Sequence, residues 1–166
     1  GDFVSGPVKK RRGGGGAAAA MGSSGKMLID LAKGNGSAAD PTIRQDLVRL
    51  HTMGELARFN NLRLKAAKQA GKDIPGMANL SKLAMSDMVR LSRDLSLRIV
   101  GPAGTLHAYT DEQRAANDEA TGNPFLSMIT GMALWAQAPP IYGGTDQIQK
   151  NIVGERVLGL PKEPSH

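Results

Sequence analysis

The residues best suited to chemistry lie in two glycine turns beside helical patterns, "RIVGPAG" at residues 98–104 and "YGGT" at residues 142–145. Glycine lets the backbone come within contact distance of another group, and the bare N–H groups at a helix start favour an anion such as a phosphate. A pyrophosphate-containing ligand would therefore suit both turns. Each turn also has a purely structural interpretation. Gly101 can simply end a helix, and Gly143–Gly144 can simply connect two elements after two prolines.

Residue content disfavours several other kinds of site. The chain has no cysteine, which excludes disulfides, a thiolate nucleophile and cysteine metal sites. Its histidines are too far apart in sequence to suggest a cluster of metal ligands. We therefore predict no metal site. The histidines are His51, His107 and His166.

The net charge of +6 would suit a polyanionic partner, but the charges are mostly dispersed. Four basic residues, "KKRR" at 9–12, are consecutive, whereas the other cations are spread singly among Asp and Glu. Lone charges of that kind usually solvate a surface. One hypothesis is a nucleic-acid-binding module that uses this basic cluster. It is weaker than the two hypotheses given below, because four charges without an aromatic platform bind nucleic acid weakly and with strong salt dependence.

The sequence carries no sign of membrane insertion or secretion. No apolar run approaches the roughly 20 residues that cross a bilayer. The start "GDFVSGPVKKRR" places its charges after a weak apolar patch, whereas a secretory signal places them before a strong one. We expect a cytoplasmic protein that does not contact the membrane.

The composition predicts an all-α fold. Apolar residues make up 40% of the chain and aromatic residues only 4%, and the mixture of Leu, Ala, Met, Ile and Val favours helices over sheets. Residues 1–25, which are rich in Gly and Ala, are predicted to be a flexible lead-in. Ser23 and Ser24 are predicted to cap a short helix that ends at Gly34.

Three longer helical patterns follow. Asp40 and Pro41 predict the start of a helix that runs to about Ala70. The next pattern ends at Gly101, and the one after it begins at Pro124. The apolar stripes expected to face the core are Ile43, Leu47, Leu50 and Leu62; Leu80, Leu83, Ala84, Met88, Leu91, Leu95 and Ile99; and Phe125, Met128, Met132 and Trp135.

A short last helix completes the predicted fold. Thr145 is expected to cap it, with Ile148 and Ile152 on its inner face. The polar segment at 105–123 has room for one more short helix. These elements predict an antiparallel four-helix bundle with a short extra C-terminal helix. The predicted domain spans residues 26–162 and is followed by a tail at 163–166.

Three stretches together resemble the acyl-CoA dehydrogenase family. "IYGGTDQIQKNIVGERVLGLP" at 141–161 resembles the family's C-terminal signature nearly without gaps. "LRIVGPAG" at 97–104 resembles its glycine loop, and "DPTIRQDLVRL" at 40–50 resembles the preceding long helix of bacterial members. The resemblance covers about residues 27–162, which implies the family's C-terminal four-helix domain without its N-terminal helical and middle β domains.

The resemblance also implies a cofactor, FAD, which lies partly between subunits. Thr145 would hydrogen-bond the flavin nucleotide through its hydroxyl and backbone N–H, and Gln147 would bind it through its amide. Gly101 and Gly104 match the family loop that approaches the dinucleotide of the partner subunit. Arg98 replaces the family's usual Gln, and it would either meet a phosphate or complement the helix C-terminus. The predicted cofactor-binding residues are Arg98, Gly101, Gly104, Tyr142, Gly144, Thr145 and Gln147.

The family's reaction needs a carboxylate base, which this chain does not supply at the family's positions. Many members place a Glu directly after the Tyr of the turn, where this chain has Gly143. Other members carry the base before a glycine-rich stretch, where this chain has the cations at 9–12. Glu55 and Glu155 are interpreted as surface residues of helices. We predict no catalytic residue here and expect the base from another chain or from residues preceding Gly1.

The resemblance thus implies the C-terminal domain of an FAD-dependent acyl-CoA dehydrogenase. Such a domain contributes to flavin binding and subunit assembly while an acyl-CoA thioester is oxidised to the 2,3-enoyl-CoA. The implied partners are acyl-CoA, other dehydrogenase chains in a homo- or hetero-oligomer, and the electron-transfer flavoprotein as electron acceptor. The alternative hypothesis is a non-catalytic helical partner that stabilises an active subunit.

Overall fold

The computed structural model describes the backbone of residues 15–162 and the side chains of residues 25–162. Within these residues all regular structure is helical and no strand is present, which confirms the predicted all-α fold. The helices are α1 (Gly15–Gly34), α2 (Pro41–Gln69), α3 (Met77–Val100), α4 (Asp111–Thr121), α5 (Leu126–Trp135) and α6 (Asp146–Ile152), with short helical turns η1 (Ser37–Ala39), η2 (Gly101–Thr105) and η3 (Val153–Val157).

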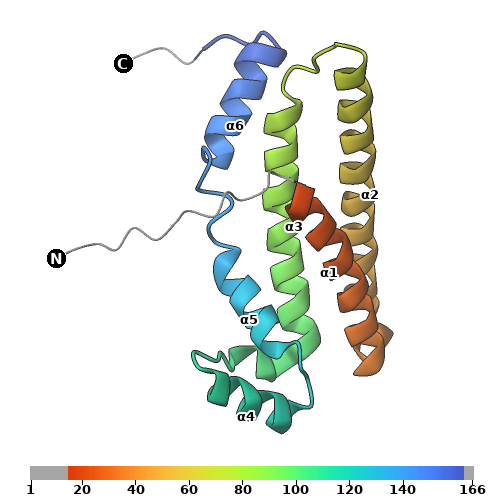
Figure 1. Ribbon diagram of the computed structural model, residues 1–166, viewed down its shortest axis with the longest axis vertical. Helices are drawn as coiled ribbons and strands as arrows, with labels where there is room; N and C mark the ends of the chain where they lie inside the picture. The colour runs from red at the N-terminus through yellow and green to blue at the C-terminus, as the bar shows by residue number, and fades with distance from the viewer. Residues whose placement is uncertain (1–14, 163–166) are drawn as a thin grey trace, which may run out of the picture.

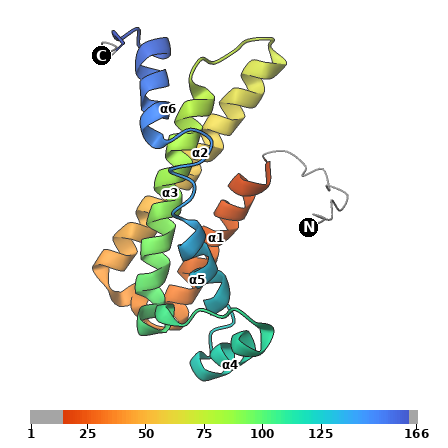
Figure 2. The ribbon, with the colours of Figure 1, turned by 90° about the vertical axis from the view of Figure 1, so that its left-hand side faces the viewer.

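Helix α3 is the central element of the fold. It runs antiparallel to α2 and also contacts α1, α5 and α6 (Figure 1). Helix α6 lies beside the N-terminal half of α3 and α5 beside its C-terminal half, while Figure 2 shows α4 standing off beyond the end of α3. The predicted antiparallel bundle with a short C-terminal helix is therefore confirmed.

A buried apolar cluster joins α1, the first half of α2 and the second half of α3. The three residues from α2 recur at the spacing of one helical face, as predicted. Helices α1 and α3 contribute Leu28 and Leu95, which are both fully buried. The cluster consists of Leu28, Ala32, Ile43, Leu47, Leu50, Leu95 and Ile99.

Local sequence determines where α2 begins. The carboxylate of Asp40 accepts hydrogen bonds from the N–H and the hydroxyl of Thr42, each at 2.7 Å. Pro41 occupies the first helical position, where its missing N–H costs nothing. The helix start predicted from Asp40 and Pro41 is confirmed.

The first helix begins earlier than predicted. Because α1 starts at Gly15, the cap expected at Ser23–Ser24 is wrong, and residues 15–25 are helical rather than a flexible lead-in. The alanines at 17–20 have the highest helix propensity of any residue and offset the cost of the nearby glycines. The basic cluster "KKRR" and the predicted C-terminal tail lie outside the described residues.

The apolar stripe predicted for the inner face of α5 is on the wrong side. Phe125, Met128 and Trp135 are 45%, 51% and 48% exposed, whereas Leu126 and Ile129 are fully buried. Because α5 is apolar on more than one side, helical spacing alone permits either face. The helix also begins at Leu126, two residues after the proline expected to start it.

The inner face of α6 is polar. Asp146 and Gln149 are its buried residues, whereas Ile148, which was predicted to face inward, is 50% exposed. Leu62 of α2 and Leu80 of α3 are also exposed rather than buried. The spacing of apolar residues therefore does not predict which residues are buried where a helix packs through polar contacts or extends past its neighbours.

Replacing Leu95 by Ala is expected to lower the free energy of unfolding by about 2–5 kcal/mol, because this side chain is fully buried in the cluster. The matched truncation Leu62→Ala, at an exposed position, is expected to change it by about 0.5 kcal/mol or less. Urea unfolding followed by far-ultraviolet circular dichroism measures both. Equal losses in the two variants would contradict the assignment of the core.

Candidate functional site

A tight turn at residues 138–146 joins α5 to α6 and contains the "YGGT" sequence. The Tyr142 N–H donates to the carbonyl of Ala138 at 3.0 Å, and the Asp146 N–H donates to the carbonyl of Pro140 at 3.0 Å. These two hydrogen bonds hold both ends of the turn, so contacts within the turn determine the shape of its backbone.

Gly143 and Gly144 form the exposed tip of this turn. Their φ angles are +65° and +83°, in the left-handed region that glycine enters at little cost. Within the described residues, the N–H groups of Gly143, Gly144 and Thr145 donate no hydrogen bond. The tip therefore offers backbone donors to solvent or to a ligand.

Thr145 caps α6, as predicted. Its hydroxyl oxygen accepts a hydrogen bond from the Ile148 N–H at 3.3 Å. Because a hydroxyl both accepts and donates, capping leaves the Thr145 proton available to another acceptor. Tyr142 and Gln147 are exposed beside it. The structure therefore brings together four of the predicted cofactor residues: Tyr142, Gly144, Thr145 and Gln147.

Gln149 supports the turn from the protein side. Its side-chain Nε2 donates to the carbonyl of Gly143 at 2.8 Å, and its Oε1 accepts from Nδ2 of Asn79 on α3 at 2.6 Å. Gln149 is only 8% exposed. The turn is thus connected to α3 through two side-chain amides.

An ion-pair cluster fixes the start of α6 on α3. The buried carboxylate of Asp146 lies 2.7 Å from Nζ of Lys82 and 3.0 Å from Nη1 of Arg90. Nη2 of Arg90 also binds Asp87 at 2.6 Å. Burial by itself would raise the pKa of Asp146, but hydrogen bonds from α3, with that of Lys82 the largest, outweigh burial and lower it. Asp146 is therefore a charged anchor.

The second predicted turn contains Arg98, whose guanidinium already has partners. It binds the Asp46 carboxylate at 2.5 Å through Nη1 and the Thr42 hydroxyl at 2.7 Å through Nη2, and so joins α3 to α2. Arg98 also lies in the last turn of α3, which agrees with its interpretation as a cation that complements the helix C-terminus. The contact with α2 was not predicted. A contact of Arg98 with a ligand stays a prediction.

Gly101 and Gly104 lie just after Arg98, in η2. Gly101 ends α3 with a φ of +61°, which explains the glycine on structural grounds. A Cβ on Gly104 would lie 3.0 Å from Leu97 Cδ2 and 3.2 Å from Val100 Cγ2, so a larger residue there would require these side chains to shift slightly. Neither observation excludes a ligand, and neither requires one.

The two turns do not meet in one chain. Asp146 contacts Lys82 and Arg90, whereas Gly101 directly follows the last residue of α3. The 11 residues from position 90 to position 101 span about 16 Å of helix at 1.5 Å per residue. A single pyrophosphate cannot bridge them within this chain.

A groove of about 1140 Å³ lies beside the second turn. Val100 and Ala103 form one wall, and α1 and the segment before α5 form the others. Met27, Leu31, Phe125 and Met128 make much of its lining apolar. The exposed outer face of α5 therefore continues into this groove.

The model of the family described as "Acyl-CoA dehydrogenase, C-terminal domain" matches residues 13–158, which is most of the sequence. The match includes both glycine turns and the whole of helices α1 to α6. The chain belongs to the acyl-CoA dehydrogenase family. The family resemblance predicted from three stretches of sequence is confirmed.

Two relatives of this chain are named acyl-CoA dehydrogenase IpdE1. The protein from Mycolicibacterium smegmatis is 34% identical over 139 residues, and the one from Mycobacterium tuberculosis is 31% identical over 139 residues. Each alignment covers 82% of this chain but only 30% and 31% of the respective relative. The chain thus spans less than a third of the length of these relatives.

Solved structures agree on the fold. Two structures described as the Tcur3481-Tcur3483 steroid ACAD, one of them a G363A variant, superpose with TM-scores of 0.68 and 0.69. Each superposition covers 89% of this chain and 37% of the other, at 22% and 20% identity respectively. At this identity the likeness concerns the fold of the chain alone.

Two kinds of feature are absent from the described part of the chain. None of its described helices combines the length and apolarity needed to cross a bilayer. The described residues also contain no group of three His, Asp or Glu side chains arranged to hold a metal ion.

Sequence reasoning missed the residues that support the site. Asn79, Lys82 and Arg90 are polar residues of α3, and Asp146 and Gln149 are polar residues of α6. The sequence did show that Asp146 and Gln149 are three positions apart and therefore share one face of a helix. Their burial could be found only from the packing of α6 on α3.

The substitution Asp146→Asn tests this anchor. It is expected to destabilise the chain at pH 7 by about 3 kcal/mol, because it leaves a nearly buried Lys82 without its anion. Since the pKa of Asp146 is lowered on folding, its contribution is present above its unfolded pKa of about 3.9 and is lost as pH falls through the lower folded pKa. The difference from the parent should therefore shrink below about pH 4.

Urea unfolding of both proteins across this pH range measures the effect. Asp87→Asn, which removes a more exposed partner of Arg90, is the matched control and should cost about 1 kcal/mol or less. A constant difference between Asp146→Asn and the parent down to pH 3 would contradict the assigned ion pair.

Proposed function

We propose that this chain is the C-terminal domain of an FAD-dependent acyl-CoA dehydrogenase and provides one part of a flavin site. The observation that carries this proposal is the turn at Gly143–Gly144. Its tip is exposed and offers the Thr145 hydroxyl together with N–H groups that have no partner among the described residues, while its base is fixed on α3 through Asp146 and Gln149. Preorganised donors of this kind suit the acceptor atoms of a nucleotide.

The residues of the turn fit part of FAD. Backbone N–H groups, the Thr145 hydroxyl and the Gln147 amide suit its phosphate, ribityl or adenine atoms, whereas the turn offers no broad surface for the flavin ring. When bound, FAD supplies hydride acceptance during oxidation of the acyl thioester. We therefore assign nucleotide binding to Tyr142, Gly144, Thr145 and Gln147, and ring binding to parts of the enzyme other than this turn.

The separation of the two turns supports a site shared between subunits. Since about 16 Å of α3 lies between them, one chain would use Thr145 for one FAD and Gly101 and Gly104 for the FAD of a neighbouring chain. Arg98 lies at the second turn with its charge balanced by Asp46. It would therefore contribute hydrogen bonds to that nucleotide more than net charge.

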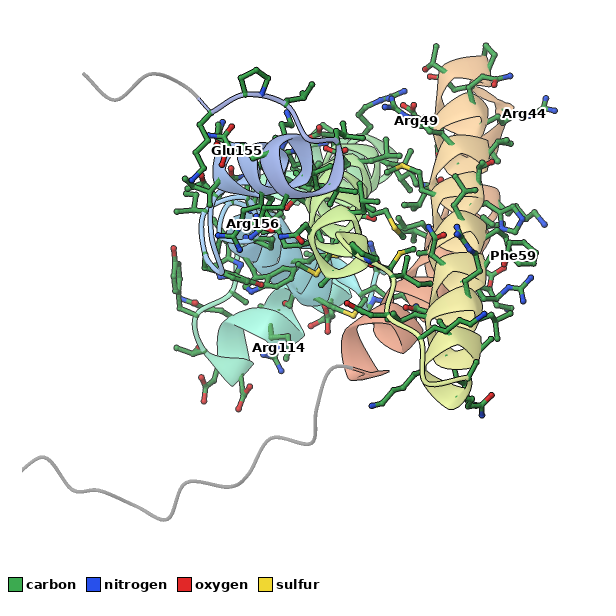
Figure 3. All side chains as sticks on the ribbon, turned by 90° about the horizontal axis from the view of Figure 1, so that it is seen from above. Arg44, Arg49, Phe59, Arg114, Glu155 and Arg156 are labelled. Carbon is green, nitrogen blue, oxygen red and sulfur yellow. The ribbon has the colours of Figure 1, made fainter. Side chains whose placement is uncertain are left out.

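The outer surface of α2 supports a role in assembly. Beyond Leu50, α2 has no buried residue, and Leu56, Phe59 and Leu62 are 58%, 52% and 51% exposed. Figure 3 shows Phe59 pointing away from the rest of the bundle. A row of exposed large apolar residues marks a surface that another protein covers. We assign it to contact with a second acyl-CoA dehydrogenase chain, identical or different.

One observation favours the alternative role of a non-catalytic partner. The family's base position in the turn is Gly143, and the neighbouring carboxylate of Asp146 is buried in ion pairs that lower its pKa. A carboxylate held charged in this way is a weak base and is directed toward α3. In either role the base comes from outside the described residues. Acyl-CoA and the electron-transfer flavoprotein are then partners of the assembled enzyme in the cytoplasm.

The substitution Thr145→Val tests nucleotide binding. Removing the hydroxyl is expected to weaken FAD binding about 3- to 10-fold, the effect of one lost hydrogen bond of about 1 kcal/mol. Flavin fluorescence titration of the assembled dehydrogenase measures the affinity. Thr145→Ser keeps the hydroxyl and the cap and should bind like the parent. Thr145→Asp keeps a capping oxygen but cannot donate, so an affinity equal to that of the parent would show that the cap alone matters.

The double substitution Phe59→Asp with Leu62→Asp tests assembly. It is expected to shift the chain toward the monomer by at least tenfold in the dissociation constant, because two charges would have to be desolvated in the contact. Light scattering after size-exclusion chromatography measures the mass. Gln45→Asp with Gln69→Asp adds the same charge at other exposed positions of α2 and serves as the control. Unchanged association in the first variant would refute the assignment of this surface.

A further inference from the structure

We propose that Gln149 and Asn79 are positioning residues for the nucleotide-binding turn. They fix the peptide group between Gly143 and Gly144 in the orientation that directs the Gly144 N–H toward the ligand. This inference rests on the proposed function for the identity of the ligand, which is FAD. The orientation of the peptide group itself follows from the hydrogen bonds on the protein side of the turn.

The carbonyl of Gly143 is held from the protein side of the turn. It accepts a hydrogen bond from Nε2 of Gln149 at 2.8 Å, and Gln149 is nearly buried against α3. The carbonyl therefore points into the protein. The described residues contain no cis peptide bond, and in a trans peptide the C=O and the following N–H point in opposite directions. The Gly144 N–H consequently points outward, away from Gln149.

Asn79 and Gln149 form a clamp that holds the peptide group between Gly143 and Gly144. A peptide group between two glycines rotates at little steric cost, because neither residue carries a Cβ. The hydrogen bonds that close the turn involve Tyr142 and Asp146, and none of them involves the peptide that joins Gly143 to Gly144. Within the described residues, Gln149 supplies the side-chain hydrogen bond to this peptide. Its amide therefore selects one of two peptide orientations.

Asn79 determines which way the Gln149 amide faces. An amide that turned over would present Oε1 to the carbonyl of Gly143, which cannot donate a hydrogen bond. Asn79 prevents this, because its Nδ2 donates to Oε1 of Gln149 at 2.6 Å and leaves Nε2 to face the turn. The order of donors and acceptors thus runs from Asn79 through Gln149 to the Gly143 carbonyl. This chain of hydrogen bonds therefore determines where the Gly144 N–H lies, on the opposite side of the peptide.

The ligand atom that this arrangement suits is an acceptor oxygen. The Gly144 N–H and the Thr145 hydroxyl are donors on adjacent residues of the exposed tip, and neither has used its proton within the described residues. Two neighbouring donors favour an oxygen of the flavin nucleotide over a carbon or a cation. Gln149 and Asn79 lie behind the turn and would influence FAD only through the peptide.

Gln149→Glu is the decisive variant. A carboxylate cannot donate to the Gly143 carbonyl, but it still accepts from Asn79, and it attracts the Gly144 N–H. The peptide is therefore expected to rotate, with the N–H turned inward. Two results follow: hydrogen exchange at the Gly144 amide should slow at least tenfold, and FAD affinity in the assembled dehydrogenase should fall at least tenfold. Gln45→Glu, an exposed charge-matched change on α2, should alter neither.

Asn79→Leu gives an independent measurement, because it leaves Gln149 in place but frees its amide to turn over. FAD affinity should then fall by a smaller factor, about threefold, without added charge, as expected for one weakened hydrogen bond. Amide exchange is measured by site-resolved hydrogen exchange on the chain, and affinity by flavin fluorescence titration.

The outcomes separate the two proposals. Unchanged Gly144 exchange and unchanged FAD affinity in Gln149→Glu would overturn the clamp, even if Thr145→Val weakens binding. If the parent enzyme binds FAD without any dependence on Thr145, the proposed function fails, while slowed Gly144 exchange in Gln149→Glu would still support the clamp. Slowed exchange with parental FAD affinity would overturn the assignment of the Gly144 N–H to the ligand.

Discussion

The buried carboxylate of Asp146 between Lys82 and Arg90 is the interaction on which the C-terminal part of the fold depends. Helix α6 has only seven residues and turns Asp146 and Gln149 toward α3, so an apolar face cannot hold it there. Ionic and amide contacts are directional, whereas apolar contacts tolerate sliding. Docking through Asp146 therefore sets both the position and the rotation of α6, and with them the orientation of the turn at its start.

The length of α3 imposes a second constraint. One end of this helix carries the partners of Asp146, and the other end leads into the turn at Gly101. A straight helix behaves as a rigid spacer, so the two turns stay apart whatever either one binds. A site that needs elements of both must therefore combine them from different chains. If the proposed function holds, binding of the cofactor therefore depends on association of the chains.

Sequence reasoning succeeded where local chemistry decides the structure. Asp40 and Pro41 determine a helix start through contacts within three residues, and Thr145 caps α6 for the same reason. It failed where distant packing decides. Phe125 and Met128 have the same spacing as the residues that are buried in α5, and only the neighbouring helices distinguish the two faces. The burial of Asp146 could not be predicted from the sequence either, because a charged residue is ordinarily expected at the surface.

The two glycines of the turn, which look equivalent in sequence, differ in the substitutions they can accept. A Cβ on Gly143 would meet no atom within 4 Å, so only its φ of +65° limits the residue there, and Asn or Asp can adopt that angle. A Cβ on Gly144 would lie 2.7 Å from Nε2 of Gln149. Position 144 is thus closed to every side chain while Gln149 stays in place. In related sequences, variation at position 143 and at position 144 would carry different meanings, the first concerning backbone angle and the second concerning the amide behind it.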